Sequence, residues 1–435
     1  MTRPNVLLIT VDSLRADHVS ACDPDAPVKT PNIDRIGHNG TTYTDAVAQG
    51  PFTTFSMPSL FTSRYPTGLT YVELSEDVVG VYPPADAETL TERLAEVGYA
   101  TGGFHSNPLL SNLFDFDRGF DEFDADLPFA DIELPDRLKL LTNKLRRLLR
   151  THPYLPAKMI TDRAIDWIRS RDEDRPFFCW IHYMDVHGPY QRKTGFTYYN
   201  KYRAERLWQK AVGNPDDMTP EEHDELHETY ATEIAYTDEQ VGRLLDAVSD
   251  TTNRPTVEVL TADHGEGFAE HGYYSHPHEV DDELVHVPLL VEDPTRTVEP
   301  GPITTPTELV DVAPTVLKAA DASQPASFEG VPLGSNPGDE SVAIAEAELV
   351  PALRMALRTS DWTYVVDDVR DDRYLVDRGT GDIVDEAAVP DRYDELVDIA
   401  DAHRNRPAAS ETGTASHEID DEDVQERLRQ LGYVD

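Results

Sequence analysis

Near its start the chain reads Asn5-Val6-Leu7-Leu8-Ile9-Thr10-Val11-Asp12, a continuous apolar run with one threonine that ends in an aspartate. A run of this kind is typical of a strand that is buried on both faces, as the strands of a parallel sheet are. Residues 177–183 and 257–261 follow the same pattern. Amphipathic segments with helical spacing alternate with these runs, among them residues 86–97 and 233–248. The alternation predicts an α/β fold with a mostly parallel central sheet flanked by helices.

Residue types that bind metals or catalyse reactions gather behind all three runs. They are Asp12, Arg15 and His18 after the first run, His182, Asp185 and His187 at the end of the second, and Asp263, His264, Glu266, His271, His276 and His278 after the third. In open α/β sheets, ligands bind outside the carboxyl ends of the strands. A single histidine is more often structural, but three strand ends that deliver Asp and His to one edge predict a cation site with oxygen and nitrogen ligands.

Several motifs resemble the sulfatase family of the alkaline-phosphatase superfamily. They are residues 4–18, which end in Asp12-Ser13-Leu14-Arg15-Ala16-Asp17-His18; Thr30-Pro31-Asn32-Ile33-Asp34; Thr261-Ala262-Asp263-His264-Gly265-Glu266 with Glu270-His271-Gly272; Val287-Pro288-Leu289; and Leu428-Arg429-Gln430-Leu431-Gly432-Tyr433. The likeness extends over nearly the whole chain. It implies an alkaline-phosphatase-like fold and a metal-dependent hydrolase that acts on ester bonds.

The resemblance also implies a set of site residues. The family's metal ligands fall on Asp12, Asp263 and His264, and the ion would be divalent (Mn, Ca, Zn or Mg). His187 matches the family histidine on the leaving-group side of the ester, and His276 falls where many members have a substrate-binding lysine. The fourth ligand stays open, because the family often has a second aspartate where this chain has a serine. Further candidate contacts to the substrate or the metal are Ser13, Arg15, Asn107, His182 and His271.

The chain departs from the family at the nucleophile. Thr53 stands where sulfatases present the residue that is converted to formylglycine, and Phe55 and Met57 replace the proline and arginine of the maturation signal. Threonine cannot become formylglycine, but its alcohol beside a divalent cation is a competent nucleophile. The resulting metal-site set of Asp12, Thr53, Asp263 and His264 resembles that of phosphoglycerol transferases and related phosphodiesterases of the superfamily. Ser106 and Asn107 stand where the family has a further lysine and histidine.

Two interpretations of Thr53 are open. Residues 56–62 have the pattern of a helix start that is aimed at the site, and free N–H groups at a helix N-terminus suit an anionic ester. Thr53 could therefore be the nucleophile beside this helix. Alternatively, Thr53 or Thr54 could only cap the helix, a role worth about 1 kcal/mol.

The motifs predict hydrolysis or transfer of a phosphate or sulfate ester, with phosphate favoured because the nucleophile is a threonine. The substrate would be a small molecule or a glycan- or lipid-linked ester. Two alternatives remain. A phosphomutase-like enzyme shares the fold and a threonine nucleophile, but it needs a large cap domain. An inactive scaffold that binds an anionic glycan would fit the loss of the cysteine, although all three principal metal ligands are retained.

Two regions are predicted along the chain. Residues 1–340 form the catalytic domain, with insertions at about 126–158 and 190–227 that are peripheral segments or lids over the site. The first insertion carries a basic helix at 137–150, and the second is polar, aromatic and helical. Residues 341–435 form an α+β subdomain with a small antiparallel sheet. Its strand candidates are residues 342–344, 354–358, 362–366 and 374–376, and an acidic linker at 410–423 and a terminal helix at 423–431 follow.

The chain of 435 residues is strongly acidic, with 82 acidic and 38 basic residues and a formal net charge of −44. Arginine heavily outnumbers lysine among the basic residues. Such a charge repels nucleic acid and anionic membranes, so neither is an expected partner. Because the acidic residues are spread along the whole length, we interpret them as an adaptation of the surface to concentrated salt, as in a halophilic archaeon.

Few features of the sequence indicate the cellular compartment of the protein. Cys22 and Cys179 are the two cysteines, and they predict neither a disulfide framework nor a cysteine metal site. No run approaches the 18 apolar residues that would suggest a transmembrane segment, and the first predicted strand begins at Asn5, which leaves no room for a signal peptide. We therefore expect a cytoplasmic protein. The sequence does not predict the oligomeric state.

Overall fold

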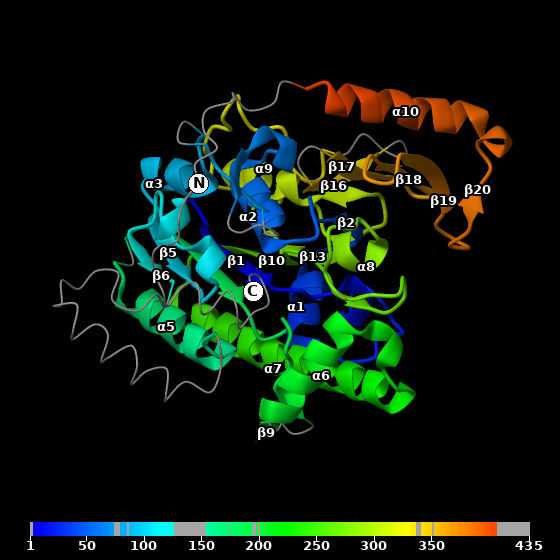
Figure 1. Ribbon diagram of the computed structural model, residues 1–435. Helices are drawn as coiled ribbons and strands as arrows, with labels where there is room; N and C mark the ends of the chain where they lie inside the picture. The colour runs from blue at the N-terminus through cyan, green and yellow to red at the C-terminus, as the bar shows by residue number, and fades with distance from the viewer. Residues whose placement is uncertain are drawn as a thin grey trace.

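The computed structural model describes residues 3–73, 79–84, 87–125, 154–172, 174–193, 197–198, 201–335, 341–349 and 352–406. A nine-stranded sheet crosses the molecule, with the order β14-β2-β13-β10-β1-β7-β5-β6 and with β15 beside β2 (Figure 1). Its strands are β1 (Asn5–Val11), β2 (Thr41–Val47), β5 (Ala100–Phe104), β6 (Glu122–Asp124), β7 (Phe177–Tyr183), β10 (Thr256–Ala262), β13 (His286–Glu292), β14 (Gly301–Ile303) and β15 (Thr307–Glu308).

The middle of this sheet is parallel. β1 pairs in parallel with β10 on one side and β7 on the other, and β7, β5 and β6 continue in the same direction. β13 runs antiparallel to both β10 and β2. Every residue of β1 and of β7 is buried, as the continuous apolar runs predict. The predicted α/β class with a mostly parallel sheet is therefore confirmed.

Helices cover both faces of the sheet (Figure 1). On one face lie α2 (Thr53–Thr62), α3 (Leu90–Glu96) and α9 (Val312–Ala319), and on the other lie α1 (Pro31–Asn39), α5 (Ala157–Ser170), α6 (Lys201–Gly213) and α7 (Pro220–Thr251). The helix predicted at 86–97 begins only at Leu90, because the Thr89 hydroxyl accepts a hydrogen bond from the backbone N–H of Glu92 and fixes the start there.

The helix predicted at 233–248 is the second half of a much longer one. α7 begins at Pro220, where Thr219 and Glu222 form a second capping box. Its first turns are largely solvent-accessible and polar, so the apolar spacing that predicts a helix becomes visible only further along. The described part of the predicted insertion at 190–227 is mostly helical, as expected. It holds α6 and the first turns of α7, and the short strands β8 (Arg192–Lys193) and β9 (Thr197–Tyr198) precede them.

Other predicted segments fall outside the described residues. They are residues 126–153 of the first insertion with its basic helix at 137–150, the acidic linker at 410–423 and the terminal helix at 423–431. Residues 157 and 158 of that insertion already belong to α5. The division of the chain at residue 340 stays a prediction.

A second, antiparallel sheet lies beside the first (Figure 1). Its strands are β16 (Ala343–Leu349), β17 (Ala352–Arg358), β18 (Trp362–Asp367), β19 (Asp372–Asp377) and β20 (Ile383–Val384). The predicted C-terminal antiparallel sheet is thus confirmed, with longer strands than expected. One face is covered by α10 (Pro390–Arg404), which buries Leu396 and Ala400 against Met355 and Tyr364. α10 was not predicted, because its apolar residues form only one narrow side of the helix.

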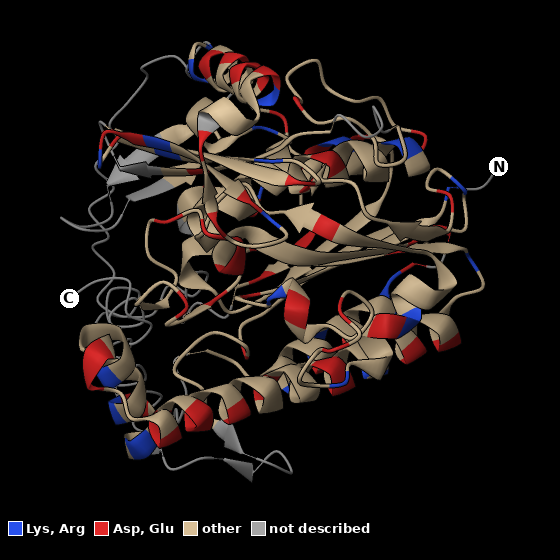
Figure 2. Ribbon diagram, turned by 90° about the vertical axis from the view of Figure 1, so that its right-hand side faces the viewer, with Lys and Arg blue, Asp and Glu red and all other residues tan. Residues whose placement is uncertain are grey.

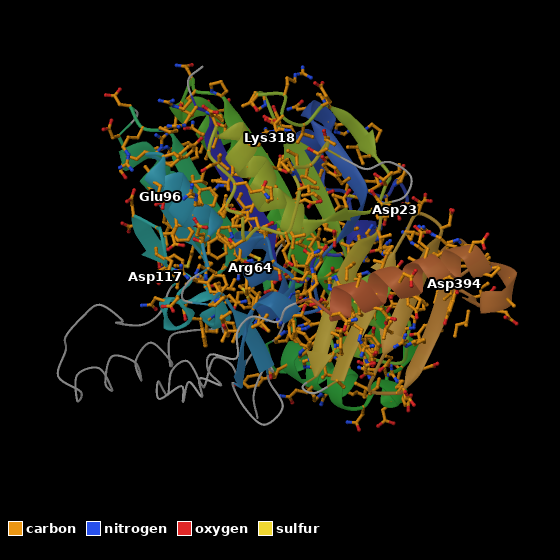
Figure 3. All side chains as sticks on the ribbon, turned by 90° about the horizontal axis from the view of Figure 1, so that it is seen from above. Asp23, Arg64, Glu96, Asp117, Lys318 and Asp394 are labelled. Carbon is orange, nitrogen blue, oxygen red and sulfur yellow. The ribbon has the colours of Figure 1, made fainter. Side chains whose placement is uncertain are left out.

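Acidic residues are frequent on the helices at the outside of the molecule. On the ribbon of Figure 2, Asp and Glu positions recur along α7 and α10, with far fewer Lys and Arg positions. Seen from above, the labelled Glu96, Asp117 and Asp394 lie at the outer margin (Figure 3). Within the described ranges, no helix combines the length and the apolar character needed to cross a membrane.

Candidate active site

Asp12, Asp263 and His264 come together at the carboxyl edge of the parallel strands. Asp12 directly follows β1, and Asp263 and His264 directly follow its neighbour β10. All three side chains are fully buried, and one ligand atom from each lies within 4.8 Å of the others. Because these three residues could hold a metal ion, they are called the metal-binding group. The three residues therefore meet at one edge of the sheet, as expected from their places at strand ends, because adjacent parallel strands end side by side.

The tautomer of His264 makes it suited to bind a cation. Its Nδ1 atom lies 2.8 Å from the backbone carbonyl oxygen of Gly265, and a carbonyl only accepts hydrogen bonds, so Nδ1 carries the hydrogen. In a neutral imidazole the lone pair is then on Nε2. That atom faces carboxylate oxygens of Asp263 and Asp12 at 3.7 and 3.9 Å and has no hydrogen-bond partner. A lone pair aimed at two carboxylates is unfavourable unless a cation lies between them.

The pKa values of the two aspartates also indicate a place for a cation. Burial and then the neighbouring carboxylate of Asp12 raise the pKa of Asp263. Burial also acts to raise the pKa of Asp12, but the electrostatic effect of the neighbouring His187, His182 and His264 outweighs it, so this pKa lies below its usual value. Two buried like charges disfavour each other's ionised form, and a divalent ion relieves that cost. Two carboxylates and one imidazole suit Mn, Zn, Ca or Mg, so the residues fit the metal that the sequence implies.

Ser13 fixes the turn that holds the two aspartates together. It has a left-handed backbone conformation with φ of 58°. Its hydroxyl donates to Asp12 Oδ1 at 2.9 Å, and its backbone N–H donates to Asp263 Oδ1 at 3.2 Å. The Tyr230 hydroxyl, from α7, donates to the Ser13 carbonyl oxygen at 2.7 Å. Ser13 thus forms hydrogen bonds to both aspartates from the position where the family often has a second aspartate.

Thr53 lies against the same carboxylates. Its hydroxyl donates to Asp263 Oδ2 at 2.7 Å, and its Oγ1 atom lies 3.4 Å from Asp12 Oδ2. The side chain is 1% exposed. Thr53 is the first residue of α2, and the N-cap position is occupied by Phe52, which makes no side-chain cap. The interpretation that Thr53 or Thr54 only caps this helix is therefore wrong, and the hydroxyl of Thr53 is directed at the metal-binding group instead.

His187 and His276 form a pair beside this group. Nδ1 of His187 lies 2.5 Å from the Gly188 carbonyl oxygen and must carry the hydrogen, which leaves its Nε2 as an acceptor. The Nε2 atoms of the two histidines lie 3.3 Å apart, so the hydrogen between them is on His276. The His276 ring also packs on the ring of His264, with centroids 4.3 Å apart. Burial, followed by the charges of His264 and His187, lowers the pKa of His276 well below its usual value.

The antiparallel sheet holds the loop that follows His276. Arg354 of β17 donates to the carbonyl oxygen of His278 and forms an ion pair with Glu279 at 3.0 Å. Arg358 of the same strand pairs with Asp282 at 2.7 Å. Because these arginines come from the smaller sheet, the loop that carries His276 is positioned by both sheets of the molecule.

The remaining candidates divide into two groups. Asn107 Nδ2 and His182 Nε2 lie 3.4 and 3.3 Å from Asp12 Oδ2 and so belong to the site. Arg15 does not point at the carboxylates of the group: its guanidinium is held by Asp17, Glu270 and the carbonyl oxygen of Glu266. The side chain of His271 is 50% exposed and its Nε2 lies 3.2 Å from Glu283, so the expectation of a site contact was wrong for this residue. The short loop from Gly265 to His271 had suggested proximity, but it carries His271 outward.

Two residues near the site, His105 and Phe52, were not among the predicted site residues. His105, which follows β5, is fully buried and packs on the rings of Phe123 and Trp180. The place where the family has a histidine was taken to be empty, although His105 stands directly before Ser106. Phe52 packs its ring on those of His276 and His278 and so walls the site beside Thr53. Aromatic walls of this kind leave no spacing signal in a sequence.

Known proteins resemble this chain over most of its length. A family model described as Sulfatase matches residues 4–322. The uncharacterized sulfatase YidJ of Escherichia coli (strain K12) is 26% identical over 362 residues, which cover 76% of this chain and 70% of that protein.

Two solved structures share the fold. A protein in complex with its substrate D-glucosamine-2-N,6-O-disulfate has a TM-score of 0.70 and 17% identity, over 94% of this chain and 100% of that one. A phosphonate monoester hydrolase of Agrobacterium radiobacter has a TM-score of 0.69 and 18% identity, over 92% of this chain and 95% of that one. The predicted alkaline-phosphatase-like fold is therefore confirmed.

Proposed function

Because the chain belongs to the sulfatase family, we propose that it is a metal-dependent hydrolase of phosphate or sulfate esters with Thr53 as its nucleophile. One observation carries the proposal: the hydroxyl of Thr53 donates a 2.7 Å hydrogen bond to Asp263, inside the group formed by Asp12, Asp263 and His264. A buried threonine whose hydroxyl is directed at two carboxylates fits a reactive group better than a packing residue.

Asp12, Asp263 and His264 would hold the divalent ion, through carboxylate oxygens and through Nε2 of the histidine. When bound, the ion would act as a Lewis acid that favours the alkoxide form of the threonine and neutralises charge on the ester. The chain itself supplies the orientation. Ser13 donates to both aspartates, and the carbonyl of Gly265 fixes the tautomer of His264.

The ester would lie at the N-terminus of α2. The first N–H groups of a helix have no partner within the helix and carry a partial positive charge, so they stabilise an anionic group. α2 is ten residues long and begins at Thr53 itself. Thr53 Oγ1 would attack the phosphorus or sulfur atom while the hydroxyl proton moves toward Asp263 Oδ2, with which it already forms a hydrogen bond.

His187 and His276 would act on the leaving group. A new bond forms from Thr53 to the central atom as the bond to the leaving oxygen breaks, and that oxygen needs a proton. The hydrogen on Nε2 of His276 lies between the two histidines, so the pair offers a donor close to the metal-binding group. Water would then release the group held on Thr53, or an acceptor alcohol would take it in a transfer reaction.

The substrate class follows from the nucleophile and from the relatives. Threonine favours a phosphorus ester over a sulfate ester, because a formylglycine nucleophile is absent. The relatives cover both chemistries by name, a substrate with sulfate groups in one structure and phosphonate monoesters in the other. We therefore expect a small-molecule, glycan-linked or lipid-linked ester, with phosphorus preferred.

A substrate panel tests this function. Nitrophenyl esters of phosphate monoester, phosphodiester, phosphonate and sulfate would each be assayed with Mn, Ca, Zn or Mg in concentrated salt. We expect hydrolysis of at least one phosphorus ester, which requires a metal and is abolished by a chelator. Activity that survives complete removal of metal would exclude the proposed role of the ion. A protein that binds the metal but hydrolyses none of the esters would favour the inactive scaffold.

We also propose that the acidic surface is an adaptation to salt. At low ionic strength the formal net charge of −44 repels itself across the molecule, whereas at molar salt the repulsion is screened within about 3 Å. The midpoint of thermal unfolding should therefore rise as KCl increases from dilute buffer to molar concentrations. Calorimetry in a KCl series would measure it. A midpoint that is highest in dilute buffer would contradict this interpretation.

A further inference from the structure

His182 is a buried histidine at the site whose role the metal-binding group does not explain. It lies on β7 directly opposite Thr10 of β1, and its Nε2 atom lies 3.3 Å from Oδ2 of Asp12. Because side chains alternate along a strand, Thr10 and Asp12 share one face of β1, and Trp180 and His182 share one face of β7. Their contacts show that the two faces are the same, so these four side chains form a row that ends at Asp12.

The hydrogens along this row can be assigned in sequence. The indole Nε1 of Trp180 can only donate, and it lies 3.0 Å from Thr10 Oγ1, which therefore accepts. The threonine keeps one hydrogen of its own to donate. Nδ1 of His182 lies 2.9 Å away and is the nearer of its two acceptors, since the carbonyl oxygen of Ile181 lies at 3.3 Å. With Nδ1 as the acceptor, the hydrogen of a neutral imidazole is on Nε2.

The opposite assignment is disfavoured by Asp12. If Thr10 donated to the Ile181 carbonyl, Nδ1 of His182 would carry the hydrogen and its Nε2 lone pair would face a carboxylate oxygen at 3.3 Å. Two acceptors at that distance repel each other in a fully buried place. With the hydrogen on Nε2, the same 3.3 Å contact places a polar N–H beside the carboxylate of Asp12 and becomes attractive.

We propose that Trp180, Thr10 and His182 form a hydrogen-bond relay that positions Asp12 for metal binding. In this relay His182 is a positioning residue and not a metal ligand. The inference rests on the proposed function only in that Asp12 is taken as a ligand of the ion. Nδ2 of Asn107 donates to the same oxygen, Oδ2, at 3.4 Å, whereas Oδ1 accepts from the Ser13 hydroxyl and faces Nε2 of His264 at 3.9 Å.

His264 and His182, two of the histidines at the site, therefore have opposite tautomers for opposite tasks. His264 carries its hydrogen on Nδ1, held by a backbone carbonyl, and presents a lone pair to the metal position. His182 carries its hydrogen on Nε2, held by a threonine hydroxyl, and presents a donor to a ligand. The relay also agrees with the presence of Ser13 where the family often has a second aspartate. A site with two aspartates and not three has less negative charge to attract the ion, so it depends more on each carboxylate being held in place.

The tautomer of His182 can be measured directly. A two-bond proton–nitrogen correlation spectrum of the metal-free protein, labelled with ¹⁵N in its histidines, distinguishes protonated from unprotonated ring nitrogens. The His182 signals are identified by their loss in the variant His182→Asn. We expect Nε2 to carry the hydrogen and Nδ1 to be unprotonated. A hydrogen on Nδ1 would overturn the relay. The spectrum needs neither metal nor substrate, so it stands even if the protein hydrolyses no ester.

Metal affinity supplies a second readout. Thr10→Val removes the donor to His182 and should weaken Mn²⁺ binding about tenfold or more in calorimetry, as loss of a group that orients a ligand does. Thr10→Ser keeps the hydroxyl and should stay close to the wild type. Trp180→Phe removes the N–H group together with part of the buried ring, and should have a smaller effect on Mn²⁺ affinity in the same direction.

A matched control separates the relay from simple loss of a buried hydroxyl. Thr315 in α9 is equally buried, donates to the Asp311 carbonyl and accepts from the N–H of Leu333. Thr315→Val should lower the unfolding temperature without changing Mn²⁺ affinity. If Thr10→Val binds Mn²⁺ as tightly as the wild type, or if Thr315→Val weakens binding as much as Thr10→Val does, the relay does not position Asp12.

Discussion

Replacement of Thr53 by alanine should lower kcat by about three orders of magnitude or more, as loss of a covalent nucleophile does in other hydrolases. The hydroxyl is the group that would attack the ester, and no other hydroxyl is seen to donate to Asp263 in the described part of the chain. Steady-state kinetics on the best ester of the panel would measure the loss. Thr53→Ser keeps a hydroxyl and should retain partial activity.

Metal affinity and a neighbouring threonine provide the controls. Thr53→Ala should bind Mn²⁺ nearly as well as the wild type, because both aspartates and His264 remain. Thr54→Ala removes the adjacent hydroxyl of the same helix and should stay active. If Thr54→Ala is inactive and Thr53→Ala is active, the nucleophile has been placed one residue too early. If both variants are active, threonine does not form a covalent bond to the substrate, and water is the attacking group.

Replacement of Asp263 by alanine should abolish metal binding without unfolding the chain. Asp263 would supply one of two ligand carboxylates, and its removal also relieves the repulsion between two buried like charges. For the wild type, Mn²⁺ at 100 times its Kd should stabilise the folded state by about 2.7 kcal/mol. Thermal unfolding with and without the ion would show this increase in the wild type and none in Asp263→Ala.

The exposed Asp117 offers the matched control for this experiment. Asp117→Ala removes the same charge at the margin of the molecule and should keep the full stabilisation by Mn²⁺ (Figure 3). A metal-dependent rise in unfolding temperature that persists in Asp263→Ala would show that the ion binds elsewhere. A variant that is unfolded without metal would show that Asp263 is needed for the fold itself.

The central sheet and the metal-binding group could be predicted because both follow from local sequence. A strand buried on both faces needs a continuous apolar run, and Asp12, Asp263 and His264 come directly after two such runs. Parallel neighbours end at one edge, so no long-range information was needed to bring these residues together. The same logic extended to His182, which ends the third run.

Long-range contacts could not be predicted in the same way. The direction of β13, the anchoring of the His276 loop by Arg354 and the cover of α10 all depend on how distant segments pack. His271 shows the opposite error, because closeness in sequence to His264 was taken as closeness in space. The tautomers of His264 and His182 depend on single carbonyl and hydroxyl neighbours, which only the folded structure reveals.

Covalent trapping on Thr53 tests the proposed function most directly. The protein would be mixed with its best phosphorus ester and Mn²⁺ in concentrated salt, quenched in acid within the first turnover, and digested for peptide mass spectrometry. We predict that the peptide containing Thr53 gains the mass of the transferred group, and that the gain is absent in Thr53→Ala and when the ion is chelated. Turnover with no modified peptide, or with the group on a different residue, would contradict catalysis by Thr53.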